Sequence, residues 1–414
     1  MTVSDLSAPL TLPCGQVLPN RLMKSALSEV LADRHGAPDH RLERLYATWA
    51  TGGYGLLVTG NVMVDGRQIG EPGNVVAEDE RHLPQLTRWA AATRAHGVPL
   101  WMQLNHPGRQ ANPMALRSTP VAPSPIAVKI PGASTPRELT GAEIEDVIER
   151  FATTAAIAEK AGFDGVQVHA AHGYLVAQFL SPLSNQRTDE WGGDPERRMR
   201  FAIEVVRRVR SRVSPGFAVG IKLNSADFQR GGFTEEQSKD VVAALSTEGL
   251  DLIEVSGGSY ESTAMFGAAA STVEREAYFL EYARAVREVA GDVPLAVTGG
   301  FRSRTAMESA LSSGDCDVIG LGRPTCTTPD AANVILAGAD ARIASHRIGF
   351  STTGLLSRVT DVKAVNSAID LGWHEDQLHR MGAGLQPDVS RTKLAAAASL
   401  VRRNGRDAFA KRRG

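Results

Sequence analysis

The chain has 414 residues, and 43% of them are hydrophobic, which is ample for a large core. Its formal net charge of −1 excludes a general attraction to nucleic acid or to anionic membranes. Three scattered cysteines argue against a disulfide scaffold and an iron–sulfur cluster, and they indicate a reducing compartment. Because no signal peptide and no bilayer-spanning apolar stretch is present, we expect a cytoplasmic protein with no nucleic-acid or membrane partner.

The predicted elements begin with a short hairpin. Residues 6–20 place Pro and Gly between brief apolar pieces, which predicts a hairpin that plugs one end of the domain. Eight short apolar segments recur after it, each followed by a helical pattern. Most are continuous rather than alternating, as expected for parallel strands buried on both faces. These predicted strands are Leu22–Leu27, Leu56–Val62, Leu100–Leu104, Gly165–Val168, Phe217–Leu223, Leu252–Val255, Leu295–Val297 and Val318–Leu321.

Several of the intervening helices have recognisable starts. Thr140 with Glu143 forms a predicted capping box, and apolar residues then follow at helical spacing. Thr234 with Gln237 repeats this arrangement. Asp194 precedes a proline, which predicts an N-cap followed by Pro at the first helical position.

Eight strand–helix units in a row predict an α/β fold, a closed (β/α)8 TIM barrel. The competing doubly wound open sheet would carry Gly-x-Gly-x-x-Gly after an early strand, and the sequence has no such motif. We expect the barrel to occupy residues 1–341. A C-terminal helical extension over residues 342–414 should pack on the barrel or at a subunit interface, and its basic, Ala-rich helix over 390–413 leaves a homo-oligomer open. The long Pro-rich loop over 105–137 should help to build the pocket wall.

In such a barrel the active site lies at the carboxyl ends of the strands, so polar and glycine residues there are candidates. Gly299, Gly300 and Gly322 would let backbone N–H groups approach an anion closely, and Arg323 adds a fixed charge. Together they predict a phosphate site between the last two strands.

The densest group of candidates follows the fourth predicted strand. His169, His172 and Tyr174 fall within six residues, and two imidazoles with a phenol can hold a carbonyl oxygen and supply a proton beside it. Two histidines at i and i+3 could instead bind zinc. No third histidine or carboxylate lies nearby, since Asp189 and Glu190 are the closest downstream candidates, and we predict no metal site.

The pattern H-x-x-H-x-Y followed by SPLSNQRTDEWGG resembles the Old Yellow Enzyme family of FMN-dependent ene-reductases. The resemblance covers about residues 6–340. It implies a (β/α)8 barrel that carries one non-covalent FMN, which NADH or NADPH reduces before a small activated alkene enters the same pocket. Its further motifs are NRLMKSALS (20–28), GLLVTGNV (55–62), MQLNHPGRQ (102–110), GIKLNSADFQRGGF (220–233), EVSGG (254–258) and GLGRP (320–324).

The resemblance also implies roles for individual residues. His169 and His172 would grip the substrate carbonyl, and Tyr174 would protonate the α-carbon from the face opposite the hydride. Gln103 suits the polar edge of the flavin as donor and acceptor, and Lys222 would stabilise the anionic reduced flavin. The residues expected at the FMN are Ser25, Ala26, Leu27, Ser28, Asn61, Gln103, His169, Lys222, Gly299, Gly300, Gly322 and Arg323.

Four positions depart from the family pattern. Ala26 stands where Pro is frequent, and Ser28 stands where many members have Cys or Thr near the flavin. Val30 replaces an aromatic residue beside the substrate, which predicts a wider pocket or a residue borrowed from elsewhere. Lys222 stands where several members have Arg, so the charge is kept but the bidentate fork is lost.

Two other functions remain open from the sequence. An FMN-dependent dehydrogenase or demethylase could act oxidatively on an amine or alicyclic substrate, although the cysteine count argues against the iron–sulfur centre that some such relatives carry. A flavin-free barrel isomerase or aldolase could act on a phosphorylated substrate. In that case Lys222 would be the Schiff-base or electrostatic residue, and the glycines would hold the substrate phosphate.

Overall fold

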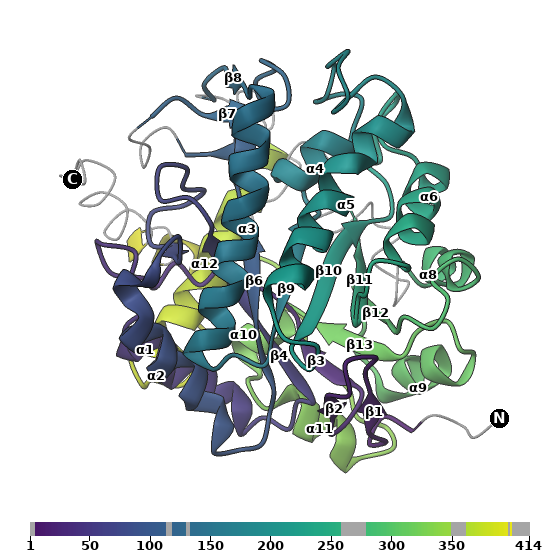
Figure 1. The fold of residues 1–414 in the computed structure, drawn as a ribbon. Helices are drawn as coiled ribbons and strands as arrows, with labels where there is room; N and C mark the ends of the chain where they lie inside the picture. The colour runs from purple at the N-terminus through teal and green to yellow at the C-terminus, as the bar shows by residue number, and fades with distance from the viewer. Residues whose placement is uncertain are drawn as a thin grey trace.

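The computed structural model describes residues 5–112, 118–129, 133–257, 279–348, 362–395 and 398–399. Within them, eight parallel strands close into a barrel, because the first barrel strand pairs with both the second and the last. The strands are β3 (Leu22–Lys24), β4 (Leu56–Met63), β6 (Leu100–Asn105), β9 (Gly165–Ala170), β10 (Ala218–Asn224), β11 (Leu252–Ser256), β12 (Leu295–Thr298) and β13 (Val318–Leu321). Each overlaps a predicted strand, and the TIM barrel is confirmed (Figure 1).

Helices surround the barrel, and the predicted helix starts are observed. Thr140 and Glu143 form a reciprocal capping box, as do Thr234 and Gln237, and the Asp194 side chain caps the helix that starts one residue later. The helices are α1 (His40–Ala50), α2 (Leu83–Arg94), α3 (Gly141–Ala161), α4 (Leu175–Leu180), α5 (Pro195–Arg212), α6 (Glu235–Leu245), α8 (Leu280–Arg287), α9 (Arg304–Ser312), α10 (Pro324–Thr327), α11 (Ala331–Ala337) and α12 (Val362–Gly382).

The N-terminal hairpin closes the amino-terminal end of the barrel, as predicted. Strands β1 (Leu10–Thr11) and β2 (Val17–Leu18) pair antiparallel. Leu18 joins the apolar cluster inside that end of the barrel, in which Trp101 is the largest side chain. The Trp101 indole N–H donates to the Gln16 side-chain oxygen at 2.9 Å, so the hairpin is fixed to the barrel interior by packing and by a hydrogen bond.

Short strands and 3₁₀ helices lie in the loops that follow the barrel strands. β5 (Val75–Val76) adds a short parallel strand beside β4, and the 3₁₀ helix η1 (Glu80–His82) leads into α2. The long loop after β6 contains the 3₁₀ helix η2 (Gly108–Gln110) and a small sheet of β7 (Val121–Ala122) and β8 (Arg137–Glu138).

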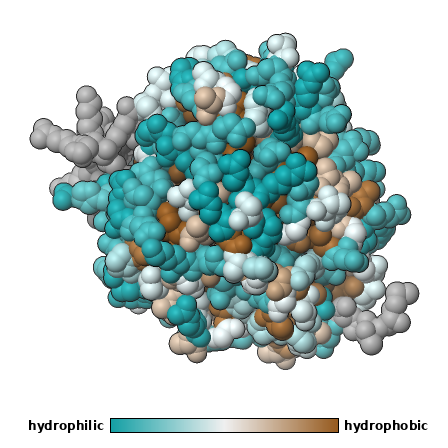
Figure 2. All heavy atoms as spheres, in the orientation of Figure 1, coloured by the Kyte–Doolittle hydropathy of each residue, from teal (hydrophilic) through white to brown (hydrophobic). Residues whose placement is uncertain are grey.

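The C-terminal extension returns to the barrel through α12, which packs against α1 and α10. It buries Trp373 and Gln377 completely, and Arg44 Nη1 donates to the Gly382 carbonyl at 3.0 Å. Most of the predicted basic helix over 390–413 lies outside the described residues, and the division after residue 341 stays a prediction. None of the described helices is long and apolar enough to cross a membrane. On the face in Figure 2 hydrophilic residues predominate, and apolar ones are scattered among them.

Candidate active site

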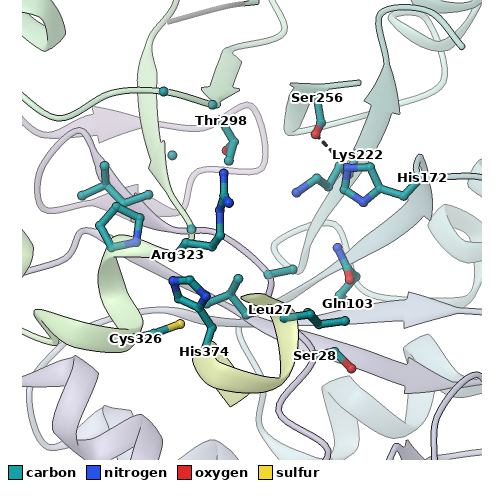
Figure 3. A pocket seen from close by; sticks show the side chains of 18 of the residues that line it. Leu27, Ser28, Gln103, His172, Lys222, Ser256, Thr298, Arg323, Cys326 and His374 are labelled. Carbon is teal, nitrogen blue, oxygen red and sulfur yellow. Dashed lines mark hydrogen bonds between the residues drawn. The ribbon is translucent and has the colours of Figure 1, made fainter. Parts of the chain in front are cut away.

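A pocket opens at the carboxyl ends of the barrel strands, and it brings together every residue predicted for the site except Ser25. In Figure 3, Lys222, His172 and Ser256 lie on one side of this pocket, and Arg323 and His374 lie on the other. Lining residues for which the sequence suggested no role include Ser256, Gly257, Phe279, Phe301, Arg302, Cys326, Asp370, Leu371, His374, Glu375 and Leu378.

The turn after β9 carries the groups predicted to act on the substrate. His172 and Gly173 have positive φ angles of 59° and 76°, so the chain reverses tightly between β9 and α4. The Asn224 side-chain oxygen accepts the His172 N–H at 3.2 Å and supports this turn. The His169 ring centroid lies 5.2 Å from that of His172 and 4.7 Å from that of Tyr174. The two imidazoles and the phenol therefore form one cluster.

Both imidazoles are neutral at physiological pH. Burial lowers the pKa of His169 well below its usual 6.5, and the proximity of His172 and the positive charge of Lys222 lower it further; burial and Lys222 do the same for His172. His169 Nδ1 accepts the Ala171 N–H at 3.3 Å, which leaves the proton of the neutral ring on Nε2. His172 Nε2 lies 2.9 Å from the Ser256 hydroxyl, so a substrate carbonyl that binds to His172 would replace Ser256 as its hydrogen-bond partner.

A buried polar network lies inside the barrel beside this cluster. Lys222 Nζ is 2.8 Å from Glu254 Oε1, and the Glu254 carboxylate also accepts from Thr298 and Gln167 at 2.7 Å each. Gln103 Nε2 donates to Gln167 at 2.8 Å. Burial raises the pKa of Glu254, but the charge of Lys222 and the three hydrogen bonds outweigh burial, and the net pKa is lowered. Lys222 is therefore both a pocket residue and a salt-bridged barrel lysine.

No role was predicted for Glu254 from the sequence, where the residue entered only as the first position of the EVSGG motif. A lone carboxylate in the otherwise apolar strand β11 needs a buried partner, and this signal could have linked it to Lys222. Ser25 belongs to the same network, because its hydroxyl lies 2.7 Å from that of Thr298. Since Thr298 donates its hydrogen to Glu254, Ser25 is the donor in this pair. Its side chain therefore faces the barrel interior.

The ends of β12 and β13 form a cradle of bare backbone. Gly299 and Gly300 have φ angles of 147° and 86°, which glycine adopts most readily. The space beside Gly322 is open, because the atom nearest to a Cβ placed there would be 3.9 Å away. The absence of a side chain at Gly322 keeps this part of the pocket free. The Arg323 guanidinium stands beside the cradle, and its Nη1 lies 3.2 Å from Asp370 Oδ2. Bare backbone with one guanidinium suits a phosphate group.

One face of α12 forms a wall of the pocket that the sequence did not reveal. Its lining residues, with His374 at the centre, follow the helical spacing i, i+1, i+4, i+5 and i+8. His374 Nδ1 lies 2.7 Å from the Asp370 carbonyl oxygen. The loop over 105–137 was expected to help build the wall, but the described part of that loop contributes no lining residue.

Ser28 lines the pocket, and its hydroxyl donates to the half-buried carboxylate of Glu71. Burial raises the pKa of Glu71, against the hydrogen bonds from Ser28 and Asn74. Val30, which the resemblance placed beside the substrate, does not line the pocket. Its φ of 49° is an outlier for a β-branched residue and marks local strain in the chain that follows Ser28.

Similarity to known proteins bears on the open alternatives. Residues 5–340 match the model of the NADH:flavin oxidoreductase / NADH oxidase family. The chain belongs to this family. It is 39% identical over 348 residues to the NADH-dependent flavin oxidoreductase iliE of Hypocrea jecorina, a match that covers 78% of this chain and 86% of that relative.

Solved structures agree with this assignment. Morphinone reductase in complex with tetrahydroNAD matches with a TM-score of 0.67 and 26% identity, over 81% of this chain and 92% of that chain. A 2-naphthoyl-CoA reductase complex matches with a TM-score of 0.75 and 27% identity, over 81% of this chain but only 53% of that chain, so this chain spans about half its length. The resemblance to Old Yellow Enzyme is confirmed, and the chain is an FMN-dependent oxidoreductase. The flavin-free isomerase or aldolase is therefore excluded.

The donors in the pocket fit FMN. Gln103 gives one amide hydrogen to Gln167, which leaves its second hydrogen and its oxygen for the polar edge of the ring. The Lys222 ammonium supplies positive charge at the pocket wall, and the glycine cradle with Arg323 suits the phosphate. Within the described ranges no three metal-ligating side chains come together.

Proposed function

We propose that this enzyme uses NADH to reduce the C=C bond of an α,β-unsaturated carbonyl compound or of a similarly activated alkene. The neutral His169–His172 pair beside Tyr174 is the observation that carries the proposal. Gln103, Lys222 and the glycine cradle with Arg323 would hold FMN, and the bound cofactor would supply the hydride transfer from the nicotinamide to the alkene. NADH is preferred to NADPH in this proposal because the fungal relative iliE is named NADH-dependent.

The residues of the turn act on the substrate carbonyl and on the α-carbon next to it. The Nε2–H of His169 donates to the substrate carbonyl, and His172 adds a second donor once the carbonyl takes the place of Ser256. Neutral donors stabilise the enolate oxygen as its charge develops. Tyr174 then protonates the α-carbon. One hydride at the β-carbon and one proton at the α-carbon saturate the bond, and NADH leaves as NAD⁺.

Titration with a para-substituted phenol tests this assignment. A phenolate that binds to the two imidazoles and stacks on the flavin should produce a long-wavelength charge-transfer band. The variant His169→Ala/His172→Ala should keep its FMN and lose at least about tenfold in phenol affinity, because two donors to a charged oxygen are removed. His96→Ala is the control, because His96 is exposed and precedes the amino end of β6, whereas the pocket lies at the carboxyl ends of the strands. Unchanged affinity in the double variant would remove the assigned role.

A second measurement separates the proposal from the oxidative alternative. NADH alone should bleach the flavin absorbance under nitrogen, and addition of an enone such as cyclohexenone should restore it. If NADH fails to reduce the flavin, dehydrogenation or demethylation of an amine or alicyclic substrate becomes the better account. A cytoplasmic location and a homo-oligomeric state remain predictions from the sequence.

A further inference from the structure

Strand β4 carries an irregularity beside the pocket. Its register with β6 shifts between Val58 and Asn61, which marks a β-bulge. Within the bulge the Thr59 hydroxyl accepts the Gln103 N–H at 2.9 Å, so a side chain takes the place of a backbone partner. Bulges next to active sites re-aim a side chain, and here that side chain is Asn61, which lines the pocket and is 9% exposed.

A buried carboxylate holds the bulge in place. Glu29 Oε1 accepts the Gly60 N–H at 2.8 Å. A Cβ at Gly60 would lie 2.1 Å from Glu29 Oε2, so the absence of a side chain is what lets the carboxylate approach. The Tyr46 hydroxyl donates to the same carboxylate, and Lys24 Nζ lies 3.9 Å from it. The bulge is therefore fixed from behind by a buried, partnered acid.

The side-chain amide of Asn61 points at the phenol of Tyr174, in the turn after β9. Its Nδ2–H donates to the Tyr174 hydroxyl oxygen at 3.2 Å, and both residues are buried. Among the residues that the structure describes, the other titratable groups near Tyr174 are the neutral His169 and His172 rings and, on the pocket wall, Lys222 paired with Glu254. An amide N–H can only donate, so it stabilises a phenolate oxygen more than a neutral phenol.

We propose that Asn61 is a positioning residue for proton delivery, because its amide N–H holds the Tyr174 hydroxyl oxygen in place and stabilises the phenolate that remains after transfer. This role rests on the proposed function, in which Tyr174 protonates the substrate. In that step the Tyr174 O–H bond breaks, a C–H bond forms at the α-carbon of the enolate, and water later reprotonates the phenolate. The sequence had placed Asn61 only at the cofactor.

The first test follows Tyr174 itself in the full-length holoenzyme. Each protein is titrated to high pH, and its ultraviolet absorbance is compared with that of a counterpart that also carries Tyr174→Phe. The difference in absorbance reports the phenolate of Tyr174. In Asn61→Ala the phenolate should appear about one pH unit higher than in the wild type, because a donor to a charged oxygen is lost. Asn61→Asp keeps the shape but presents an acceptor that holds the phenol hydrogen, so its phenolate should appear higher still.

The second test isolates proton transfer with a nitroalkene substrate. Hydride addition to a nitroalkene gives a nitronate anion stable enough to observe, and its conversion to the nitroalkane reports protonation at carbon. In Asn61→Ala this conversion should slow about tenfold more than the reduction of the flavin by NADH, which is measured in the same variant to correct for any effect on the cofactor. The pH above which this conversion slows should be higher in Asn61→Ala than in the wild type, because a Tyr174 phenol that is a weaker acid keeps its proton to higher pH. A merely structural defect would not raise this pH.

The outcomes separate this role from the proposed function. An unchanged phenolate titration in both Asn61 variants overturns the role. If Asn61→Ala does not hold FMN, the titration of Asn61→Asp, which matches asparagine in size, decides the question. If the holoenzyme reduces no activated alkene, the proposed function fails, and the titration still shows whether Asn61 acts on Tyr174.

Discussion

Replacing Lys222 by methionine tests the buried ion pair at the centre of the barrel. Methionine approximates the lysine stem but carries no charge, so the Glu254 carboxylate keeps only Thr298 and Gln167 as donors. At 2.8 Å the two charges attract each other by about 6 kcal/mol in a medium with an effective dielectric constant of about 20. Desolvation of both ions offsets much of this. We therefore expect the single substitution to lower the free energy of unfolding by about 3–5 kcal/mol.

The double variant Lys222→Met/Glu254→Gln provides the control. The glutamine oxygen still accepts from a neighbour and no buried charge is left alone, so the double variant should lie within about 2 kcal/mol of the wild type. Urea unfolding of all four proteins in excess FMN, followed by far-ultraviolet circular dichroism, measures the cycle. A double variant that loses as much as the sum of the two single variants would refute the pairing.

The acid side of the same unfolding curves gives a second check. The folded-state pKa of Glu254 lies below its ordinary value of 4.5, so the unfolded chain takes up a proton first as the pH falls. The contribution of Glu254 to stability is therefore fully present above its ordinary pKa and is lost as the pH falls through the folded value. Glu254→Gln should lack this loss. Equal acid dependence in the two proteins would contradict the assignment.

Two further predictions concern other buried groups. Burial lowers the pKa of His106 from 6.5 to about 4, so the wild type should lose stability as the pH falls through this interval. In His106→Gln the urea midpoint should change less over the same pH interval, and parallel curves for the two proteins would contradict the role of His106. Asp370 shares Arg323 with the expected FMN phosphate, so Asp370→Asn should slow FMN release by about threefold to tenfold. Recovery of flavin fluorescence on dilution measures the release, and faster release would contradict the competition.

The barrel was predictable because the local pattern and the tertiary environment agree. Strand β10 buries every residue from Ala218 to Asn224, so a parallel strand covered on both faces reads as a nearly continuous apolar run. The capping box of Thr140 and Glu143 needs only residues three positions apart, and such local interactions survive in the folded chain. The His169–Tyr174 cluster was predictable for the same reason, because one short turn holds all its members.

The wall formed by α12 was not predictable, because its partners lie far away in the sequence. The extension over residues 342–414 was expected to be helical, but that expectation does not say which surface of the barrel a helix covers. The ion pair between Asp370 and Arg323 joins residues 47 positions apart, and it forms only because α12 returns beside α10. The Asn61–Tyr174 hydrogen bond, between residues 113 positions apart, likewise depends on a bulge that no local pattern announced.

Two lysines show what residue type alone leaves undecided, since each lies in a buried barrel strand. Lys24 faces α1, where its ammonium lies 4.2 Å from the Trp49 ring centroid, and burial lowers its pKa to about 8. Lys222 faces the barrel interior, because it is in register with His169 on β9 and with Glu254 on β11. Side chains at one level of neighbouring parallel strands point to the same side of the sheet. The direction of the side chain, into the barrel or toward a surrounding helix, rather than the presence of a lysine at a strand end, therefore identifies the lysine that can act on a ligand.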